Sequence, residues 1–335
     1  MDVKLFCVIL TLPLFFKAAC LAGALVSVCA FASGAEGPHA PEPLSIGAVR
    51  ALIVSPHPDD ATLATGGLIR RVLGAGGAVK VIQMTGGDGF PQGVVAWSPR
   101  SHPTADAYRQ YGVLREHEAV RALGRLGVHR AQVRLLGFPD EGLCLLASSA
   151  PLAPVFISPY TQRESPPITE QVLPGTMYRG EDVRRELTRL LREFRPTLLV
   201  VPHSGDDHPD HCATHLLVHQ ALTAAIADGL RPPHVLHYVL HLPRWPATDQ
   251  PGGPLDPPST GSGSAWDWRT LTLTADEQAR KHRALSAFRS QILVMSDFFA
   301  AFDRPNELFI DREPSPISPC WCSGNNIAVP INGMQ

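Results

Sequence analysis

The sequence lacks the features of a nucleic-acid-binding protein. Its 335 residues include 29 Lys and Arg against 31 Asp and Glu, a formal net charge of −2, with no basic run and no known nucleic-acid-binding motif. A surface that binds a polyanion concentrates positive charge. We therefore expect no nucleic-acid partner. The chain also shows no internal repeat.

No uninterrupted apolar run is long enough to span a membrane. The N-terminal stretch is mostly apolar to about Phe31, but Lys17 divides it, and a span needs about 20 apolar residues. With Lys17 in a basic n-region, residues 18–31 form a signal-peptide core, and Ala30-Phe31-Ala32 offers a cleavage site. Residues 1–32 are interpreted as a signal peptide, with an uncleaved membrane anchor as the alternative. We expect a secreted, periplasmic or cell-envelope protein that contacts membrane only through an uncleaved leader.

Cysteine is scarce outside this leader. Four of the seven cysteines lie after the leader, namely Cys144, Cys212, Cys320 and Cys322. The last two form Cys-Trp-Cys, which is too closely spaced for the usual Cys-x-x-Cys zinc or redox pair. A disulfide from the tail to the body suits an oxidising compartment, and the spacing assigns no pairing.

The periodicity predicts one α/β domain over residues 49–313, between a linker at 33–48 and a Pro- and Cys-containing tail at 314–335. Thr274 and Glu277 form a predicted capping box. Strands alternating with helices indicate a Rossmann-like three-layer sandwich with a mostly parallel sheet. The expected strands are 51–54, 79–84, 133–136, 197–201, 235–240 and 270–273, and the expected helices are 60–73, 107–126, 180–194, 211–227 and 275–291.

In two segments the apolar residues show neither the helical nor the strand period. Residues 142–178 are rich in proline and serine, and residues 246–264 are rich in glycine, proline and serine. A loop as long as the first is uncommon inside a compact domain. We interpret 142–178 as a substrate-side insertion or lid, and we expect both segments to form walls of the pocket.

The dinucleotide-binding fingerprint Gly-x-Gly-x-x-Gly is absent after the first strand, which disfavours a nicotinamide dehydrogenase. His57-Pro58-Asp59-Asp60 stands there instead. A second cluster follows the strand at 197–201. Because ligands bind beyond the carboxyl ends of parallel strands, both clusters are expected at one edge of the sheet. The second cluster comprises His203, Asp206, Asp207, His208, Asp210 and His211.

These residue types suit a zinc hydrolase. Catalytic zinc takes three nitrogen or oxygen ligands and leaves a position for water, and His57, Asp60 and His211 supply such a set. Asp59 is placed to accept the proton of that water. His208, about one helical turn before His211, is expected to stabilise the oxyanion or to protonate the leaving amine.

Simpler interpretations exist for several of these side chains. Asp59 and Asp60 also suit the cap of the following helix, and Asp88 suits its glycine-rich turn. We expect His203 and His215 to be structural or surface residues, and His219 to line the same helix face as His211 and His215. Three histidines on or beside a strand carry no metal spacing, namely His234, His237 and His241.

Pro56-His57-Pro58-Asp59-Asp60, together with His208-Pro209-Asp210-His211, resembles the PIG-L/LmbE-like N-acetylglucosaminyl deacetylase family. That family includes the de-N-acetylases of GPI-anchor, mycothiol and bacillithiol synthesis. The resemblance covers about residues 50–295. Weaker matches are Thr85-Gly86-Gly87-Asp88-Gly89, Arg115-Glu116, Leu136-Gly137-Phe138-Pro139-Asp140, and Lys281 to Ser290-Gln291.

The resemblance implies the Rossmann-like fold, with His57, Asp60 and His211 as ligands of Zn²⁺ or of another divalent metal such as Fe²⁺. It also implies Asp59 as general base and His208 as the electrostatic or acid partner. The family usually has Glu after the acidic pair, whereas this chain has Ala61. Weaker support of the metal is the expected consequence.

The expected function is removal of an N-acetyl or related N-acyl group from an amino-sugar-containing substrate, a hydrolysis of a linear amide. A deacylase of a non-sugar amide, such as an acylated antibiotic or peptide, would use the same site. Ala61 and the extra loops motivate another alternative, a non-catalytic sugar-binding envelope protein on the same fold. Asp59 beside a complete ligand set argues against that alternative, because binding alone needs no base.

Overall fold

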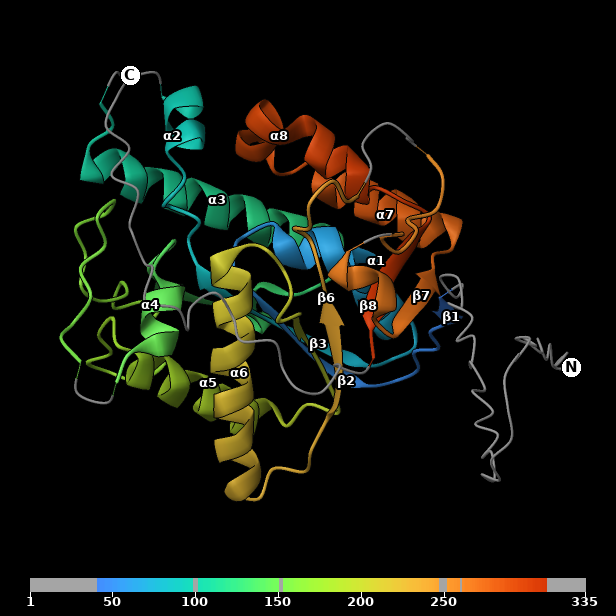
Figure 1. Ribbon diagram of the computed structural model, residues 1–335, viewed down its shortest axis with the longest axis horizontal. Helices are drawn as coiled ribbons and strands as arrows, with labels where there is room; N and C mark the ends of the chain where they lie inside the picture. Colours follow the sequence, from blue (N-terminus) through green and yellow to red (C-terminus); the bar gives the residue numbers. More distant parts are fainter. Residues whose placement is uncertain (1–40, 99–101, 151–152, 247–251, 260, 312–335) are drawn as a thin grey trace, which may run out of the picture. The chain divides into compact units, whose positions relative to one another are not determined.

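The computed structural model describes residues 41–98, 102–150, 153–246, 252–259 and 261–311 (Figure 1). The expectations for the leader, for residues 33–40 of the linker and for the tail lie outside these ranges. Within them, no helix is both long and apolar enough to cross a membrane.

The described strands form one eight-stranded sheet in the order β1-β7-β8-β6-β5-β2-β3-β4. Every neighbouring pair is parallel except the two that involve β8, so the predicted mostly parallel sheet is confirmed. The sequence did not predict β8, and β1 lies within the predicted linker. The bounds are β1 Glu42–Pro43, β2 Arg50–Ser55, β3 Ala78–Thr85, β4 Val133–Phe138, β5 Leu198–Pro202, β6 His234–Tyr238, β7 Trp268–Thr272 and β8 Asn306–Ile310.

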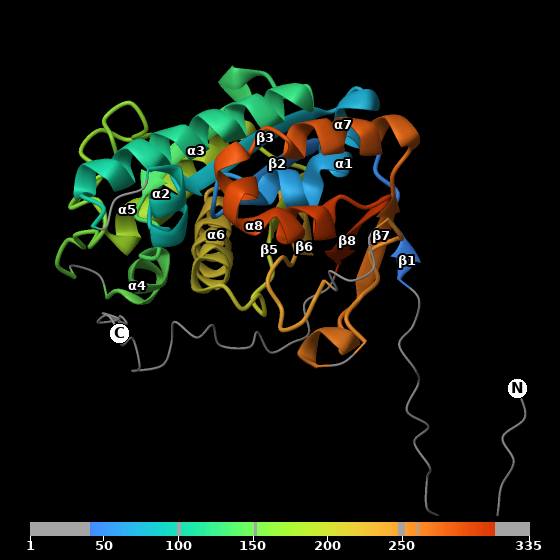
Figure 2. The ribbon, with the colours of Figure 1, turned by 90° about the horizontal axis from the view of Figure 1, so that it is seen from above.

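Helices cover both faces of this sheet, as a three-layer sandwich requires (Figures 1 and 2). Along β2, Leu52 belongs to the core cluster to which α4, α5 and α6 contribute, whereas Ile53 belongs to the cluster to which α1, α3, α7 and α8 contribute. Successive side chains of a strand point to opposite faces, so a continuous apolar run serves both layers. The helices are α1 Asp60–Gly74, α2 Pro91–Trp97, α3 Ala105–Arg125, α4 Leu143–Ser148, α5 Gly180–Phe194, α6 Pro209–Ala227, α7 Ala275–Leu285 and α8 Arg289–Phe302.

The predicted helix 275–291 is wrong in extent, because α7 ends at Leu285 and α8 begins at Arg289. The break is held by α3. Arg125 donates to the Ser286 Oγ at 3.1 Å, and the Glu118 carboxylate accepts from the backbone N–H of Ser290 at 3.0 Å. These partners are remote in sequence. The capping box at the start of α7 is confirmed.

The segment 142–178 is not structureless in its described part. It contains α4, and the Tyr178 hydroxyl donates to the carbonyl of Gly137 at 2.9 Å. The buried Glu186 carboxylate of α5 accepts from Val172 N at 3.0 Å and from the Thr176 hydroxyl at 2.6 Å. The segment is therefore anchored to α5 and to the end of β4.

The strand order creates a crevice at the carboxyl edge. From β2 the chain continues outward through β3 and β4, while β5 and β6 lie on the other side of β2. Ligands of α/β sheets bind at such a reversal. The loops that follow β2 to β6 all reach this edge, and they carry the candidate site.

Candidate active site

The turn after β2 brings His57, Asp59 and Asp60 to this edge. Asp60 is the first residue of α1, and its Oδ2 accepts a 2.7 Å hydrogen bond from the backbone N–H of His57. Asp59 occupies the N-cap position without a capping hydrogen bond from its side chain. The contacts therefore do not support the interpretation that this acidic pair only caps the helix.

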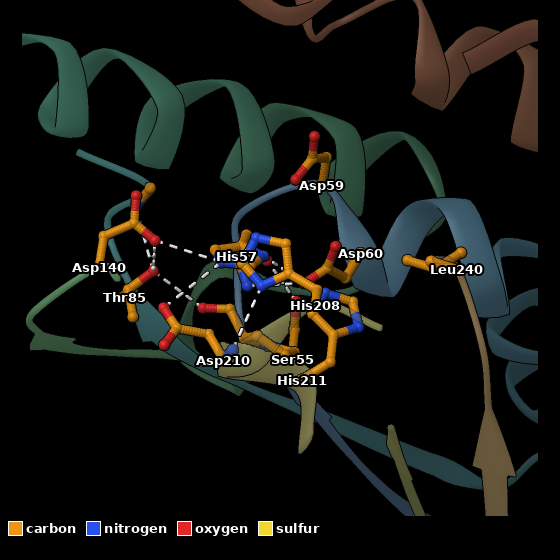
Figure 3. Close-up of polar contacts among 12 residues, drawn as sticks. Ser55, His57, Asp59, Asp60, Thr85, Asp140, His208, Asp210, His211 and Leu240 are labelled. Atoms are coloured by element: carbon orange, nitrogen blue, oxygen red, sulfur yellow. Dashed lines mark hydrogen bonds and ion pairs between the residues drawn. The ribbon is translucent and has the colours of Figure 1, made fainter. Parts of the chain in front are cut away.

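Two of the predicted metal ligands, His57 and His211, converge on a carboxylate oxygen of the third, Asp60 (Figure 3). Asp60 Oδ2 lies 3.3 Å from His57 Nδ1 and 3.3 Å from His211 Nε2. All three residues are buried, and His211 Nε2 has no hydrogen-bond partner among the described residues. A buried imidazole nitrogen facing a carboxylate is the donor arrangement that zinc accepts. The residues present thus fit a divalent metal.

A second carboxylate lies behind each of these two imidazoles. Asp140 Oδ1 is 3.2 Å from His57 Nε2, and Asp206 Oδ2 is 3.2 Å from His211 Nδ1. Such outer carboxylates fix the tautomer and orientation of ligating histidines. The sequence alone predicted no role for Asp140 or Asp206. The available signal was their position just after β4 and β5.

Asp206 also joins two loops. Its Oδ1 accepts from the backbone N–H of His208 at 3.0 Å, and its Oδ2 accepts from Leu240 at 2.8 Å and His241 at 3.2 Å. Burial opposes its charge, but His211, His241 and these N–H groups hold the pKa of Asp206 well below its ordinary value. The ionised carboxylate therefore ties the loop after β5 to the loop after β6.

His208 lies in the same cavity as the predicted ligands, with its ring centroid 4.6 Å from that of His57. As N-cap of α6, its Nδ1 accepts from the backbone N–H of Asp210 at 3.2 Å. The proton of the neutral ring is then on Nε2, 3.7 Å from Glu141 Oε1. Burial, reinforced by His57, lowers the pKa of His208 well below its ordinary value. A neutral N–H donor in the cavity is compatible with stabilisation of the oxyanion, the first of the two roles predicted for His208, and that role stays a prediction.

His241 corrects an expectation. The sequence suggested no metal spacing, but its ring centroid lies 4.8 Å from that of His211, and it can form a donor group with Asp60 and His211 whose ligand atoms lie within 4.8 Å of one another. It also stacks on Phe298 at 5.2 Å. Because β6 is the parallel neighbour of β5, residues beyond its carboxyl end reach the same edge.

Asp59 points toward helix α3 (Figure 3). There Arg115 Nη2 lies 3.1 Å from Asp59 Oδ1. Arg115 also donates to the carbonyl of Gly87 at 2.7 Å. Gly87 has a φ of +64°, and a Cβ there would lie 2.1 Å from Arg115 Nη1, so this turn requires glycine. Burial raises the pKa of Asp59, and Arg115 opposes the shift. Such a carboxylate suits proton transfer.

These side chains open into a cleft of about 780 Å³. Tyr160 of the segment 142–178 contributes to its wall, as expected, but no described residue of 246–264 does. Leu255 of that segment instead packs on β8 through a 2.6 Å hydrogen bond to Asn306. Asp88 is partly buried and does not line the cleft. The lining residues are His57, Asp59, Asp60, Gly89, Phe90, Pro91, Gln92, Arg115, Asp140, Glu141, Tyr160, His208, His241, Gln291, Met295 and Phe298.

Five other histidines considered in the sequence analysis do not line the cleft, namely His203, His215, His219, His234 and His237. The His203 ring packs on Trp266 at 4.1 Å, which agrees with a structural role. His234 is exposed at the start of β6. A separate group formed by His215, His219 and His237 lies between α6 and β6.

Comparisons with known proteins agree on one family. Residues 52–222, which include both histidine motifs, match the family model PIG-L, described as GlcNAc-PI de-N-acetylase. Two relatives are named 1D-myo-inositol 2-acetamido-2-deoxy-alpha-D-glucopyranoside deacetylase. The one from Rhodococcus opacus is 34% identical over 52% of this chain and 54% of its own, and the one from Kribbella flavida is 26% identical over 78% and 90%. The chain thus spans about half the length of the first relative.

Among solved structures, N,N'-diacetylchitobiose deacetylase from Pyrococcus horikoshii is 17% identical. The alignment covers 78% of this chain and 83% of that chain, with a TM-score of 0.47.

Proposed function

The chain belongs to the PIG-L family, and from this premise we propose that it is a metal-dependent hydrolase that removes an N-acetyl or related N-acyl group from an amino-sugar-containing substrate. The observation that carries the proposal is the position of Asp60 Oδ2, 3.3 Å from both His57 Nδ1 and His211 Nε2, with the Asp59 carboxylate in the same cleft.

His57, Asp60 and His211 would hold the metal, Zn²⁺ or another divalent ion such as Fe²⁺. A divalent ion held there supplies Lewis acidity toward the amide carbonyl and toward water. Asp140 and Asp206 orient the two imidazoles, since each lies 3.2 Å from the nitrogen that faces away from Asp60.

Asp59 and His208, which lie beside the three metal ligands, act on the proton of water and on the developing negative charge. Asp59, held by Arg115, takes a proton from the attacking water. The neutral His208 donates a hydrogen bond from its Nε2–H to the oxygen that becomes negative. Asp59 then passes the proton that it took from water to the departing nitrogen. The amide C–N bond breaks, and acetate and a free amine leave.

The proposed substrate is an N-acetylated sugar or glycoconjugate. The relatives support this class because their names specify a 2-acetamido-2-deoxy-glucopyranoside. A cleft of about 780 Å³ lies within the usual range for small-molecule sites, about 300–1,000 Å³.

A non-cytosolic location is part of the proposal. Cys144 and Cys212 are both disulfide-bonded, and structural disulfides persist in oxidising compartments. Together with the apolar leader this supports a secreted or periplasmic protein, or an envelope-anchored one if the leader stays uncleaved.

The test is acetate release by the full chain from a panel of N-acetylhexosamines and their glycosides, with zinc and iron content measured in parallel. Asp59→Asn should lose nearly all activity while keeping the ion of the Asp60 centre, and His57→Ala should lose both the activity and that ion. Asp276→Asn, an exposed acid that pairs with Arg280 on α7, should behave as wild type. Full activity in both site variants contradicts the mechanism. Sugar binding without acetate release from any substrate favours the non-catalytic alternative.

A further inference from the structure

A second group of three histidines lies between helix α6 and strand β6. His215 and His219 are one helical turn apart on α6, and His237 comes from β6. One ring nitrogen of each lies within 4.8 Å of the others. The ring centroids are 4.2 Å apart for His215 and His219, and 5.4 Å apart for His215 and His237. Three imidazoles from two elements therefore face one point.

The spacing of the donor atoms matches that of ligands around one ion. His219 Nε2 and His237 Nε2 are 3.4 Å apart. Two nitrogens that each lie about 2.0–2.1 Å from one zinc ion, at a tetrahedral angle, are about 3.3–3.4 Å apart. The pair already has the separation that binding would require.

His215 is held in the tautomer that a ligand needs. Its Nδ1 lies 3.1 Å from the carbonyl oxygen of Pro202, which can only accept, so Nδ1 carries the proton. Nε2 then presents its lone pair. A ligating histidine commonly donates its other N–H to a backbone carbonyl in this way.

The surroundings favour neutral rings. Burial lowers the pKa of all three, and the neighbouring imidazoles add to this effect for His215 and His237. Protons therefore compete weakly with a metal at neutral pH. His219 is only partly buried, which leaves a route from solvent and an open position for water.

We propose that His215, His219 and His237 form a second metal site, separate from the Asp60 centre, that binds a divalent ion of borderline softness, zinc foremost. Three neutral imidazoles with one open position are a common zinc donor set. Binding replaces the hydrogen bond between His219 and His237, whose shared proton moves to an Nδ1 atom or leaves to solvent. The ion would clamp α6, which carries His211, to β6, which leads to His241.

Metal stoichiometry tests this proposal without an activity assay. The full chain is stripped with a chelator and dialysed against Zn²⁺, and bound zinc is counted by mass spectrometry. Wild type should hold two ions, His219→Ala one, His57→Ala one, and the double variant none. His117→Ala, which removes an exposed imidazole on α3, is the matched control and should hold two.

Cobalt locates the ion. In His57→Ala, added Co²⁺ should produce the visible absorption of a four-coordinate site, and His57→Ala/His219→Ala should lose it. Thermal unfolding of the metal-free variants checks that His219→Ala folds, and His219→Gln repeats the test. Wild-type stoichiometry in a folded His219→Ala protein overturns the proposal, as does one ion in wild type and none in His57→Ala. Acetate release bears on the proposed function alone, so the two failures are distinguishable.

Discussion

Replacing Asp206 by Asn tests whether the carboxylate behind His211 controls metal binding. The side chain is 1% exposed and accepts hydrogen bonds from three backbone N–H groups, those of His208, Leu240 and His241, while its Oδ2 also lies 3.2 Å from Nδ1 of His211. Asparagine has nearly the same shape but exchanges one acceptor oxygen for a donor. No orientation of the amide satisfies all four groups.

The expected loss of stability in Asp206→Asn follows from the amide orientation that keeps more of these contacts. With the amide oxygen in the Oδ2 position, three contacts survive, and the amide NH₂ faces the backbone N–H of His208. One buried N–H then lacks an acceptor, which costs about 1–3 kcal/mol of stability. The charge behind His211 is also lost. Outer-ligand changes of this kind weaken metal binding about 10- to 100-fold, equivalent to about 1.4–2.8 kcal/mol.

The assay is competition between the protein and a chromophoric chelator for zinc, in the His219→Ala background so that the Asp60 centre is measured alone. Urea unfolding followed by circular dichroism gives the stability, and acetate release at saturating zinc gives the residual activity. Asp207→Asn is the matched control, because the neighbouring carboxylate is exposed. It should change neither quantity.

The result that refutes the reasoning is an Asp206→Asn protein whose zinc affinity stays within about twofold of its parent. In that case the carboxylate would only hold the loops together, and the stability loss alone would remain.

Three further predictions concern other parts of the fold. Gly87→Ala should push Arg115 out of place and lower acetate release about 100-fold with zinc content unchanged, measured at saturating substrate. Lys281→Met breaks a buried 2.8 Å ion pair with Glu307 and should cost about 3–5 kcal/mol in urea unfolding. Glu277→Gln should cost about 1 kcal/mol at pH 7. Burial opposes the charge of Glu277, but a hydrogen bond from Arg71 on α1 lowers the pKa of this carboxyl below its ordinary 4.5. Its stabilisation is therefore present above that pH and is lost as the pH falls through the folded-state pKa, so wild-type and variant unfolding curves should converge in acid.

The α/β architecture could be predicted from the sequence because each of its signals is local. Residues 51–54 are an apolar run long enough for a buried strand, and the helical period of 60–73 follows at once. Parallel strands present their carboxyl ends at one edge. The positions of His57, Asp60 and His211 just after β2 and β5 therefore indicated one site, and the structure brings them together.

The contacts that orient these residues were decided by tertiary structure. Asp140, Asp206 and His241 each have an ordinary local interpretation as loop or strand residues. They reach the site because β4, β5 and β6 lie at particular places in the sheet. Arg115 meets Asp59 from the middle of α3, 56 residues away. No periodic pattern encodes such a pairing, since it depends on how α3 packs against α1.

The same distinction explains why the sequence missed one strand and one helix break. Strand β8 pairs antiparallel with β6 and β7 across long separations, and the break before α8 is held by Glu118 on α3. The sequence by itself determined which segments form strands and helices and which loops carry imidazoles and carboxylates, because burial and period are properties of neighbouring residues. Strand order and helix placement decided which of those side chains face one another, because a hydrogen bond between loops depends on distances that only the assembled sheet sets.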